Sequence, residues 1–375
     1  MVDIVKINKS NAKELERFID FPHDLYADDP FYVPMVFIEQ EALLNPKKSP
    51  FFQHSTADYF LAKQNGKIVG RIAAIRNNNH ITFTGKKEGF FGFFDVVNDF
   101  SVAKKLLDTA QNWLHTEELE KMIGPSNFST NETCGLLIDN FEQPSFIMNT
   151  YNASYYVDLL TQYGFSKLVD LLCYELITKE MPQAVVDFGK KLEKRLIERG
   201  ITIRKINMKQ YQKEIENFLP IYNASWAANT GFVPMTDAEI RQIGKDLKSI
   251  IDPDFVYFAE KDGQTVGVSL TIPNVNEILI QVKRGRLFPT GALKILFGLK
   301  KIKTVRVFAL GTLKEYRRMG IDVCFYVRNI VTAREKGIIR AEASWILEDN
   351  IPMNRALEHI NAKVYRKYRL YQKAI

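Results

Sequence analysis

Cysteine and histidine are scarce in this chain, which has three cysteines and five histidines among 375 residues. Cys134, Cys173 and Cys324 lie far apart and never form a CxxC pair, and the histidines show no HExxH or similar spacing. A structural zinc site or a metalloenzyme centre needs several such ligands at short, regular spacings. The sequence therefore argues against both, and the few cysteines indicate a reducing compartment.

Long apolar runs are also absent. No run of roughly 18 apolar residues, the length that spans a bilayer, occurs in the sequence. The first ten residues, MVDIVKINKS, contain neither the apolar core nor the cleavage site of a secretory signal. We therefore expect a cytoplasmic protein with no membrane-spanning helix and no resident metal.

Charge of one sign is in modest excess, because 51 Lys and Arg against 44 Asp and Glu give a formal net charge of +7. This balance suits an anionic partner, namely nucleic acid, a phospholipid surface or a phosphorylated cofactor, although a solvated basic surface needs no partner at all. The sequence has no helix-turn-helix, zinc module or RNP pattern, so nucleic acid is the least supported of the three.

An internal repeat organises what is present. Three segments recur in the same order at offsets of 197 to 200 positions: residues 6–8 at 205–207, 33–35 at 233–235, and 60–70 at 257–267. Chance does not readily produce ordered matches at a nearly constant offset. The length also suits two domains of about 150–200 residues each.

Each copy has the same predicted order of elements. The pairs Asn65-Gly66 and Asp262-Gly263 lie between apolar runs, which is typical of a two-residue hairpin turn between antiparallel strands. A helix, a strand, a second helix and a last strand follow in each copy. We therefore predict an α/β (α+β) fold with a first domain at 1–178, a linker helix within 179–200 that ends at Gly200, and a second domain at 201–375.

One turn in the second copy carries the strongest chemical signal. Residues 304–311 predict a strand and residues 323–336 a helix, so Arg317-Arg-Met-Gly-Ile321 forms a strand-to-helix turn. Backbone N–H groups are unpaired at a helix start, and the helix dipole adds positive potential. Gly320 permits close approach of a ligand, and two arginines lie beside it. The turn predicts a phosphate or pyrophosphate site; a basic helix cap without a ligand is the alternative.

This turn resembles motif A of the GNAT acyltransferase superfamily, written Q/R-x-x-G-x-G/A, whose amides bind the pyrophosphate of coenzyme A. Arg317 and Gly320 match the motif, whereas Asp322 stands where Gly or Ala is usual, and we expect it to turn away as a helix N-cap. The segment after the next predicted strand resembles motif B. The cofactor-binding residues that the resemblance implies are Leu310, Thr312, Leu313, Arg317, Arg318, Met319, Gly320, Ile321, Asp322, Asn350 and Asn354.

The resemblance implies two tandem GNAT-like domains and transfer of an acyl group from acetyl-CoA or a longer acyl-CoA to an amine. The tandem arrangement is similar to that of bacterial lipid-amine, ceramide-synthase-type N-acyltransferases, but amino acids and small amines stay open as acceptors. Leu357 stands where many GNAT enzymes have a tyrosine that protonates the leaving thiolate. A non-catalytic acyl-CoA-binding or sensing protein is therefore the first alternative, and a peripheral membrane protein the second.

The catalytic base has two candidates. Glu342 lies among apolar residues of a predicted strand, which would raise its affinity for protons, although it could equally be an outward-facing residue or a structural partner for an arginine. In the first copy, residues 94–100 replace the cofactor turn and contain no Arg or Gly, so we expect no coenzyme A there. That copy has a polar stretch at 124–135, in which Asn127, Asn131 and Glu132 are candidates to orient the acceptor amine, with Glu132 the second candidate base.

A last segment, residues 285–303, bears on the partner. Lys294, Lys300, Lys301 and Lys303 interleave there with Leu293, Leu296 and Phe297. Basic and bulky apolar residues in this arrangement can lie in the interface of an anionic membrane. A core helix with a basic exposed edge is the competing interpretation.

Overall fold

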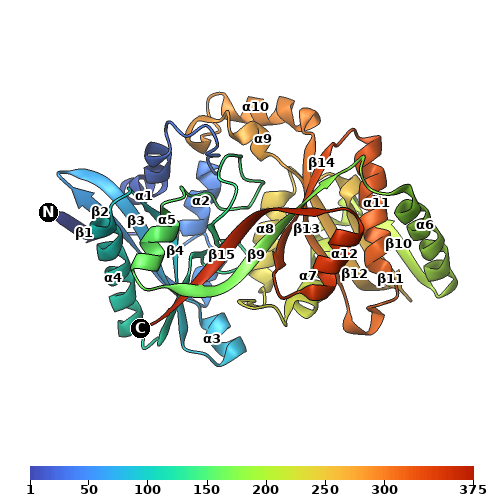
Figure 1. The fold of residues 1–375 in the computed structure, drawn as a ribbon, viewed down its shortest axis with the longest axis horizontal. Coiled ribbons are helices and arrows are strands. Elements are labelled where there is room, and N and C mark those ends of the chain that lie inside the picture. Colours follow the sequence, from blue (N-terminus) through green and yellow to red (C-terminus); the bar gives the residue numbers. More distant parts are fainter.

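The computed structural model describes all residues from 1 to 375 and contains one long mixed sheet with helices on both faces (Figure 1). The elements of the first part of the chain are β1 (Val2–Lys6), α1 (Ala12–Leu25), α2 (Phe37–Leu44), β2 (Thr56–Gln64), β3 (Lys67–Arg76), α3 (Asn78–Thr84), β4 (Glu88–Val96), α4 (Phe100–Thr116), β5 (Lys121–Gly124), β6 (Ser126–Asn127), β7 (Thr133–Cys134), β8 (Leu136–Leu137), α5 (Tyr156–Gln162) and β9 (Ser166–Ile177).

The second part repeats the order with one insertion. Its elements are α6 (Gln183–Glu198), β10 (Ile201–Lys205), α7 (Tyr211–Trp226), α8 (Asp237–Leu247), β11 (Val256–Lys261), β12 (Gln264–Pro273), α9 (Asn276–Leu279), α10 (Gly291–Gly298), β13 (Thr304–Thr312), α11 (Ile321–Glu335), β14 (Arg340–Leu347), α12 (Ile351–His359) and β15 (Lys363–Ala374). No helix in the structure has both the length and the apolarity to cross a bilayer.

The two predicted hairpins are confirmed. β2 and β3 meet at Asn65 and Gly66, whose φ angles are 51° and 76°, and β11 and β12 meet at Asp262 and Gly263, whose φ angles are 50° and 77°. Positive φ at both central residues is the geometry of a type I′ turn, which Asn, Asp and Gly accept at low cost. The local sequence thus fixes the register at the centre of each half.

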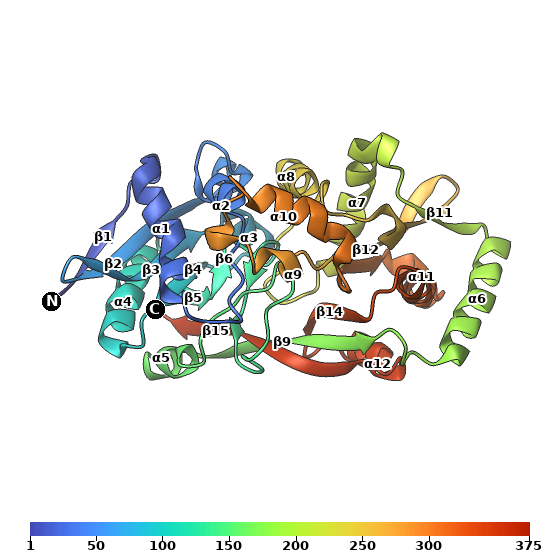
Figure 2. The same cartoon turned by 90° about the horizontal axis from the view of Figure 1, so that it is seen from above.

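Alternating side chains place different helices on the two faces of the sheet. In the first half, Tyr59 and Leu61 point into a core with α1 and α2, whereas Phe60 and Ala62 point into a core with α4 and α5. The second half does the same with α7 and α8 on one face and α6 and α11 on the other. Figure 2 shows α1, α2, α7 and α8 on one side of the sheet and α5 and α12 on the other. The period of two that defines a strand therefore builds the layers.

The two halves exchange their last strands. The order across the sheet is β1-β2-β3-β4-β5-β15-β9-β14-β13-β12-β11-β10. β9, from the first half of the sequence, pairs with β14, and β15, from the second half, pairs with β5. The exchanged strands pair with each other at the centre, where β15 runs into the half that holds both chain termini (Figure 1). Each half of the sheet therefore contains a strand from the other half of the sequence.

The helix expected within 179–200 is present as α6, and Gly200 follows its end with a φ of 77°. It packs closely against α11. The missing side chain of Gly189 makes room for Val327, whose side chain a Cβ at Gly189 would meet at 2.4 Å. The close contact fixes α6 on the face of the second half that carries the cofactor turn.

The insertion, residues 274–303, lies between β12 and β13 and contains α9 and α10, whereas only α3 lies between the equivalent β3 and β4. Arg284 forms ion pairs with Asp20 and Asp24 on α1, and Arg286 donates to Asp20 over 2.9 Å. These pairs fasten the insertion to the first half.

Candidate active site

A wedge opens where β13 and β14 separate. The two strands pair in parallel only over Thr304–Val307 and Arg340–Ala343, after which β14 pairs only with β9. The pairing of β13 with β12 is interrupted at Phe308, which lies in a β-bulge. Bulges re-aim a strand next to active sites, and ligands of α/β sheets bind beyond the carboxyl ends of the strands at such a separation. The wedge is therefore the candidate ligand site of the second half.

The predicted turn lies at the end of β13. Arg318 has a φ of 66° and Gly320 a φ of 89°, after which α11 begins. The six amides from Arg318 to Val323 donate no hydrogen bond within the protein, and the first to do so is that of Cys324, to the Gly320 oxygen over 3.1 Å. Arg317 and Arg318 are both exposed beside these amides. The turn thus combines free donors, the start of a 15-residue helix and two guanidinium groups.

Gly320 is required at this position for two reasons. Its φ of 89° is in the left-handed region, which L-residues rarely adopt. A Cβ at this position would also lie 2.2 Å from Cδ2 of Leu192 on α6. Beside it, Met319, Ile321 and Leu310 pack into the core beneath α6 and hold the turn in place.

The remaining residues of the turn are engaged locally. The Thr312 carbonyl accepts weak hydrogen bonds from Arg317 Nε at 3.4 Å and from Ser225 Oγ at 3.5 Å, and the Leu313 amide donates to the Val266 oxygen. Asp322 was expected to be the N-cap, but Gly320 takes that place. The left-handed glycine ends the turn two residues earlier, so Asp322 lies in the first turn of α11.

The far side of the wedge is the end of β14. Asn350 Oδ1 caps α12 by accepting from the Met353 amide at 3.3 Å. Asn354 is buried, donates to the oxygens of Leu347 and Glu348 at 3.1 Å each, and accepts from Tyr174 OH at 3.0 Å. Both asparagines fix the end of β14, and the Asn354 amide has both kinds of hydrogen-bonding group in use.

Glu342 lies at the vertex of the wedge, fully buried and paired in register with Arg306. Its Oε1 accepts from Asn149 Nδ2 at 2.7 Å and from Ser344 Oγ at 2.5 Å, and Arg306 Nε is 3.9 Å away. Its Oε2 accepts from Tyr365 OH. These contacts are those of the structural alternative, a buried carboxylate paired with an arginine, and a role as base stays a prediction.

The polar stretch of the first half, residues 124–135, begins where β4 and β5 stop pairing, the counterpart of the wedge between β13 and β14. Phe93 has a φ of 46° and lies in the bulge of β4. The Phe93 amide donates to Asn127 Oδ1 at 2.7 Å, and Asn127 Nδ2 donates to Thr133 Oγ1 at 2.7 Å. A Cβ on Gly92 would lie 2.0 Å from the Ser126 oxygen, so this segment rests directly on β4. Both ends of the Asn127 side chain are therefore engaged within the first half.

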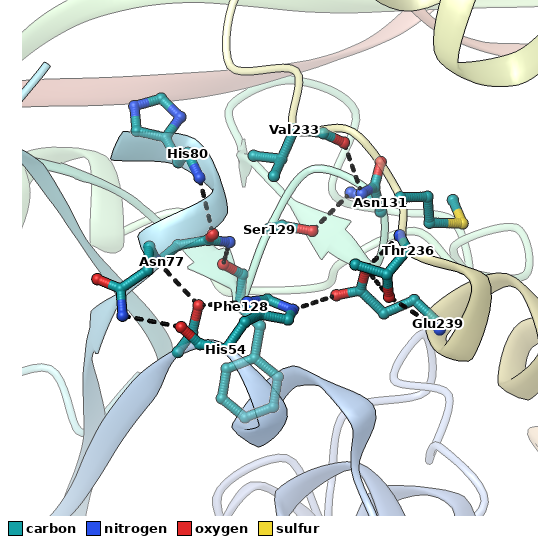
Figure 3. Close-up of polar contacts among 12 residues, drawn as sticks. His54, Asn77, His80, Phe128, Ser129, Asn131, Val233, Thr236 and Glu239 are labelled. Atoms are coloured by element: carbon teal, nitrogen blue, oxygen red, sulfur yellow. Dashed lines mark hydrogen bonds and ion pairs between the residues drawn. The ribbon is translucent and has the colours of Figure 1, made fainter. Parts of the chain in front are cut away.

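Asn131 reaches the second half (Figure 3). Its Nδ2 donates to the Val233 oxygen at 2.9 Å. Its Oδ1 accepts from Tyr222 OH at 2.9 Å. The Tyr222 ring stacks on Trp226 at 4.7 Å, and Trp226 packs against the backbone of Gly311 at the end of β13. One turn of α7 thus connects the first-half stretch to the strand that leads into the cofactor turn.

Glu132 lies beside this contact. Its Oε2 accepts from Ser129 Oγ at 2.5 Å. Burial raises the pKa of the Glu132 carboxyl to about 8, against the opposing effect of the Ser129 hydrogen bond. The nearby Glu239, which accepts from His54 at 3.0 Å, raises this pKa further (Figure 3). A carboxyl with a pKa near neutrality can act as a general base.

Sequence reasoning missed Tyr222, Asn149 and Tyr365. None lies in a motif, and each enters the site through contacts between residues more than 20 positions apart. Leu357, at the position of the usual GNAT tyrosine, lies on α12 and is buried in the hydrophobic core between α12, α11 and the sheet. No signal in a single sequence marks such contacts.

Known proteins resemble this chain over its whole length. No protein-family model matches it. The bacterial ceramide synthase of Caulobacter vibrioides is 34% identical over 381 residues, which cover 100% of this chain and 98% of that protein. The chain belongs to the family of this protein. Protein YghO of Escherichia coli strain K12 is 35% identical over 373 residues, which cover 97% of this chain and 94% of that one.

Solved structures share the fold. A tandem GNAT protein from the clavulanic acid biosynthesis pathway superimposes with a TM-score of 0.59 at 10% identity, over 100% of this chain and 98% of that one. A GCN5-related N-acetyltransferase from Sphaerobacter thermophilus superimposes with a TM-score of 0.50 at 12% identity, over 100% and 95% of the two chains. The predicted resemblance, the α/β tandem GNAT-like fold and the class of acyltransferase are thus confirmed.

Proposed function

We propose that this acyltransferase moves an acyl group from a coenzyme A thioester to the amine of a long-chain amino lipid. The observation that carries the proposal is the set of six free amides at the Arg318–Val323 turn, next to two exposed arginines and at the mouth of the wedge. The acceptor class follows the name of the relative, since ceramide is an amide of a fatty acid with a long-chain amino alcohol.

The residues of the turn fit coenzyme A. Free amides at a helix start and guanidinium groups are donors suited to a pyrophosphate. Because Gly320 has no Cβ, the turn can lie close to Leu192 and keep its conformation. When bound, the thioester supplies an activated acyl group. The backbone at Leu310 and Thr312 at the end of β13, and at Leu313 after it, would line its approach, while Asn350 and Asn354 fix the end of β14 on the opposite side of the wedge.

The first half supplies the acceptor side in this proposal. Asn131 holds the polar stretch against Tyr222, and Asn127 holds it against β4. The Glu132 carboxylate accepts the proton of the attacking amine, which positions the amine and removes a charge that would block attack. Glu342, the first candidate base from the sequence, is buried against Arg306, and this burial favours Glu132 as the base in the proposal.

Exposed apolar and basic residues of the insertion support attachment to a membrane in this proposal. Phe288 is 89% exposed, and Leu293, Leu296 and Phe297 are 54%, 63% and 69% exposed on α10. Arg284 and Arg286 are used by the first half, whereas Lys294, Lys300, Lys301 and Lys303 are exposed and form no ion pair. Apolar rings with unpaired lysines suit the cytoplasmic face of an anionic membrane, where an amino lipid resides.

A second candidate function, acyl-CoA binding without catalysis, is favoured by Leu357, which supplies no proton for the leaving thiolate. Calorimetry with coenzyme A, followed by thiol release from acyl-CoA in the presence of amine pools, separates the two. We expect one site per chain, lost in Arg317→Glu, and thiol release that depends on a long-chain amine. Binding without amine-dependent release would favour the second candidate, and binding that survives Arg317→Glu with Gly320→Val would refute the assigned site.

A further inference from the structure

An apolar cavity of about 60 Å³ lies in the second half, between helices α7 and α8 and the face of β11–β13. Of the 16 residues that line it, 14 are hydrophobic, including Val256, Phe308 and Met235. This space belongs to neither the cofactor turn nor the polar stretch.

The first half has the same elements around the same place, but large side chains fill it. The repeat aligns Gly244 with Leu44 and Val256 with Tyr59, at offsets of 200 and 197. Leu44 and Tyr59 are fully buried, and Tyr59 OH donates to the Leu44 oxygen at 3.0 Å. The ring of Phe128, from the segment that closes the first-half wedge, stacks on Phe51 at 4.3 Å and completes the filling.

The cavity therefore results from smaller residues in the second half together with the absence of a closing segment. Gly244 has a packing role as well, since a Cβ there would lie 2.4 Å from Ile215 on α7. Packing does not require a small residue at Val256, because its counterpart Tyr59 fits a full aromatic ring at the same place in the first half. Protein cores normally fill voids of this kind, so an unfilled one next to a ligand site indicates an occupant.

The position of the cavity connects it to the wedge. Phe308 lines the cavity and is also the bulge residue at which β13 leaves β14. Tyr222 lines the cavity and contacts Asn131 of the polar stretch. The cavity thus shares Phe308 with the start of the wedge and Tyr222 with the contact to the polar stretch.

We infer that this cavity receives the hydrocarbon chain of the acyl donor and sets the chain length that the protein accepts. The inference rests on the proposed function and adds the subsite for the chain. No polar lining group is free to recognise a headgroup: Glu214 pairs with Arg204 at 2.7 Å, and Tyr211 OH donates to the Gly244 oxygen at 2.7 Å. A chain with no polar atoms is the ligand that such walls admit.

The donor is the source of the chain because of where the cavity lies. It is built from the half that holds the cofactor turn, whereas the groups assigned to the acceptor come from the first half. Its size also sets a limit. An engineered cavity of about 150 Å³ admits benzene, so 60 Å³ holds a few carbons as it stands. Longer chains require displacement of flexible lining side chains such as Met235.

The test is a chain-length series measured by calorimetry on the full chain: coenzyme A alone, then saturated acyl-CoAs of increasing length. For the parent, the affinity for the acyl-CoA should rise about fourfold for each methylene that enters the cavity, because that is the effect of fully burying one methylene. The affinity should level off once the cavity is full. Val256→Tyr, which installs the first-half residue, should remove this rise and leave the affinity for coenzyme A itself within twofold. Val364→Tyr, at a strand position 38% exposed, is the matched control and should behave as the parent.

A second variant keeps the test valid if Val256→Tyr does not fold. Leu247→Ala enlarges the cavity, so the rise should continue to longer chains than in the parent. A series of amines of increasing length, measured by turnover with one acyl-CoA, tests the other source of a chain. The inference would be overturned if acyl-CoAs bound no more tightly than coenzyme A itself. It would also be overturned if Val256→Tyr changed the chain-length dependence of the amine series and not that of the acyl-CoA series. Absence of coenzyme A binding by the parent would instead refute the proposed function on which it rests.

Discussion

Gly320→Ala is the smallest change that tests the cofactor turn. The residue has a φ of 89°, and the added methyl would lie 2.2 Å from Leu192 Cδ2. A left-handed conformation costs an L-residue about 1–2 kcal/mol, and overpacking in a closed contact costs typically 1–3 kcal/mol. If the turn keeps its shape, we therefore expect the free energy of unfolding to fall by about 2–5 kcal/mol.

If the turn instead yields, the free amides from Arg318 to Val323 no longer converge. The affinity for coenzyme A should then fall by about tenfold or more, since one charge-assisted hydrogen bond contributes roughly 1.5–3 kcal/mol. Denaturant unfolding and calorimetry with coenzyme A, measured on the same protein, separate the two outcomes.

Leu192→Ala provides the matched background, because it removes the atom that the new methyl would meet. In this background Gly320→Ala should cost only the conformational part, so the two changes should couple by about 1–3 kcal/mol in a double-mutant cycle. If Gly320→Ala changed neither the unfolding free energy nor the affinity for coenzyme A, the turn would not be the constrained phosphate site described here.

The remaining predictions concern the acceptor side and the membrane. Thiol release should rise with pH through about 8, since a base must lose its proton, and Glu132→Gln should remove this rise with coenzyme A affinity unchanged. Asn131→Ala, which loses two contacts with the second half, should lower turnover tenfold or more without changing that affinity. Flotation with anionic vesicles should be salt-sensitive and should be lost on changing four lysines to glutamate, namely Lys294, Lys300, Lys301 and Lys303, because each contributes about 1 kcal/mol; equal flotation of variant and parent would contradict it.

The parts of the fold that local residues determine could be predicted from the sequence. Asn65-Gly66 and Asp262-Gly263 specify type I′ turns through their own positive φ angles. The strand before the cofactor turn and the helix after it follow from alternation and from Gly320, which no other residue type replaces without strain. Asn361 also adopts the left-handed geometry that asparagine accepts, with a φ of 63°.

The parts that distant residues determine could not be predicted. The repeat places β9 and β15 last in each copy, and nothing in either strand states which half it joins, because both choices satisfy the same alternation. The contacts of Glu342 with Asn149 and Tyr365 have the same cause, since they arise only once the strands have exchanged. The cavity beside Phe308 depends on how much space α7 and α8 leave above the sheet, which residue spacing does not give.

The strand exchange explains why a half without a cofactor turn is retained. β5 gains its outer partner only from β15, and β14 gains its own only from β9, so neither half of the sheet is complete without the other half of the sequence. The vertex of the wedge is shared as well: Arg306 donates to the Ile147 oxygen at 2.6 Å, and Glu342 accepts from Asn149, both on a loop of the first half. Removing the first half would therefore expose the edge of β14 and leave a buried ion pair without its hydrogen bonds, a loss of several kcal/mol at the point where β13 and β14 diverge. The first half thus shapes the wedge through the β9 strand, the Ile147 carbonyl and the Asn149 side chain, independently of its polar stretch.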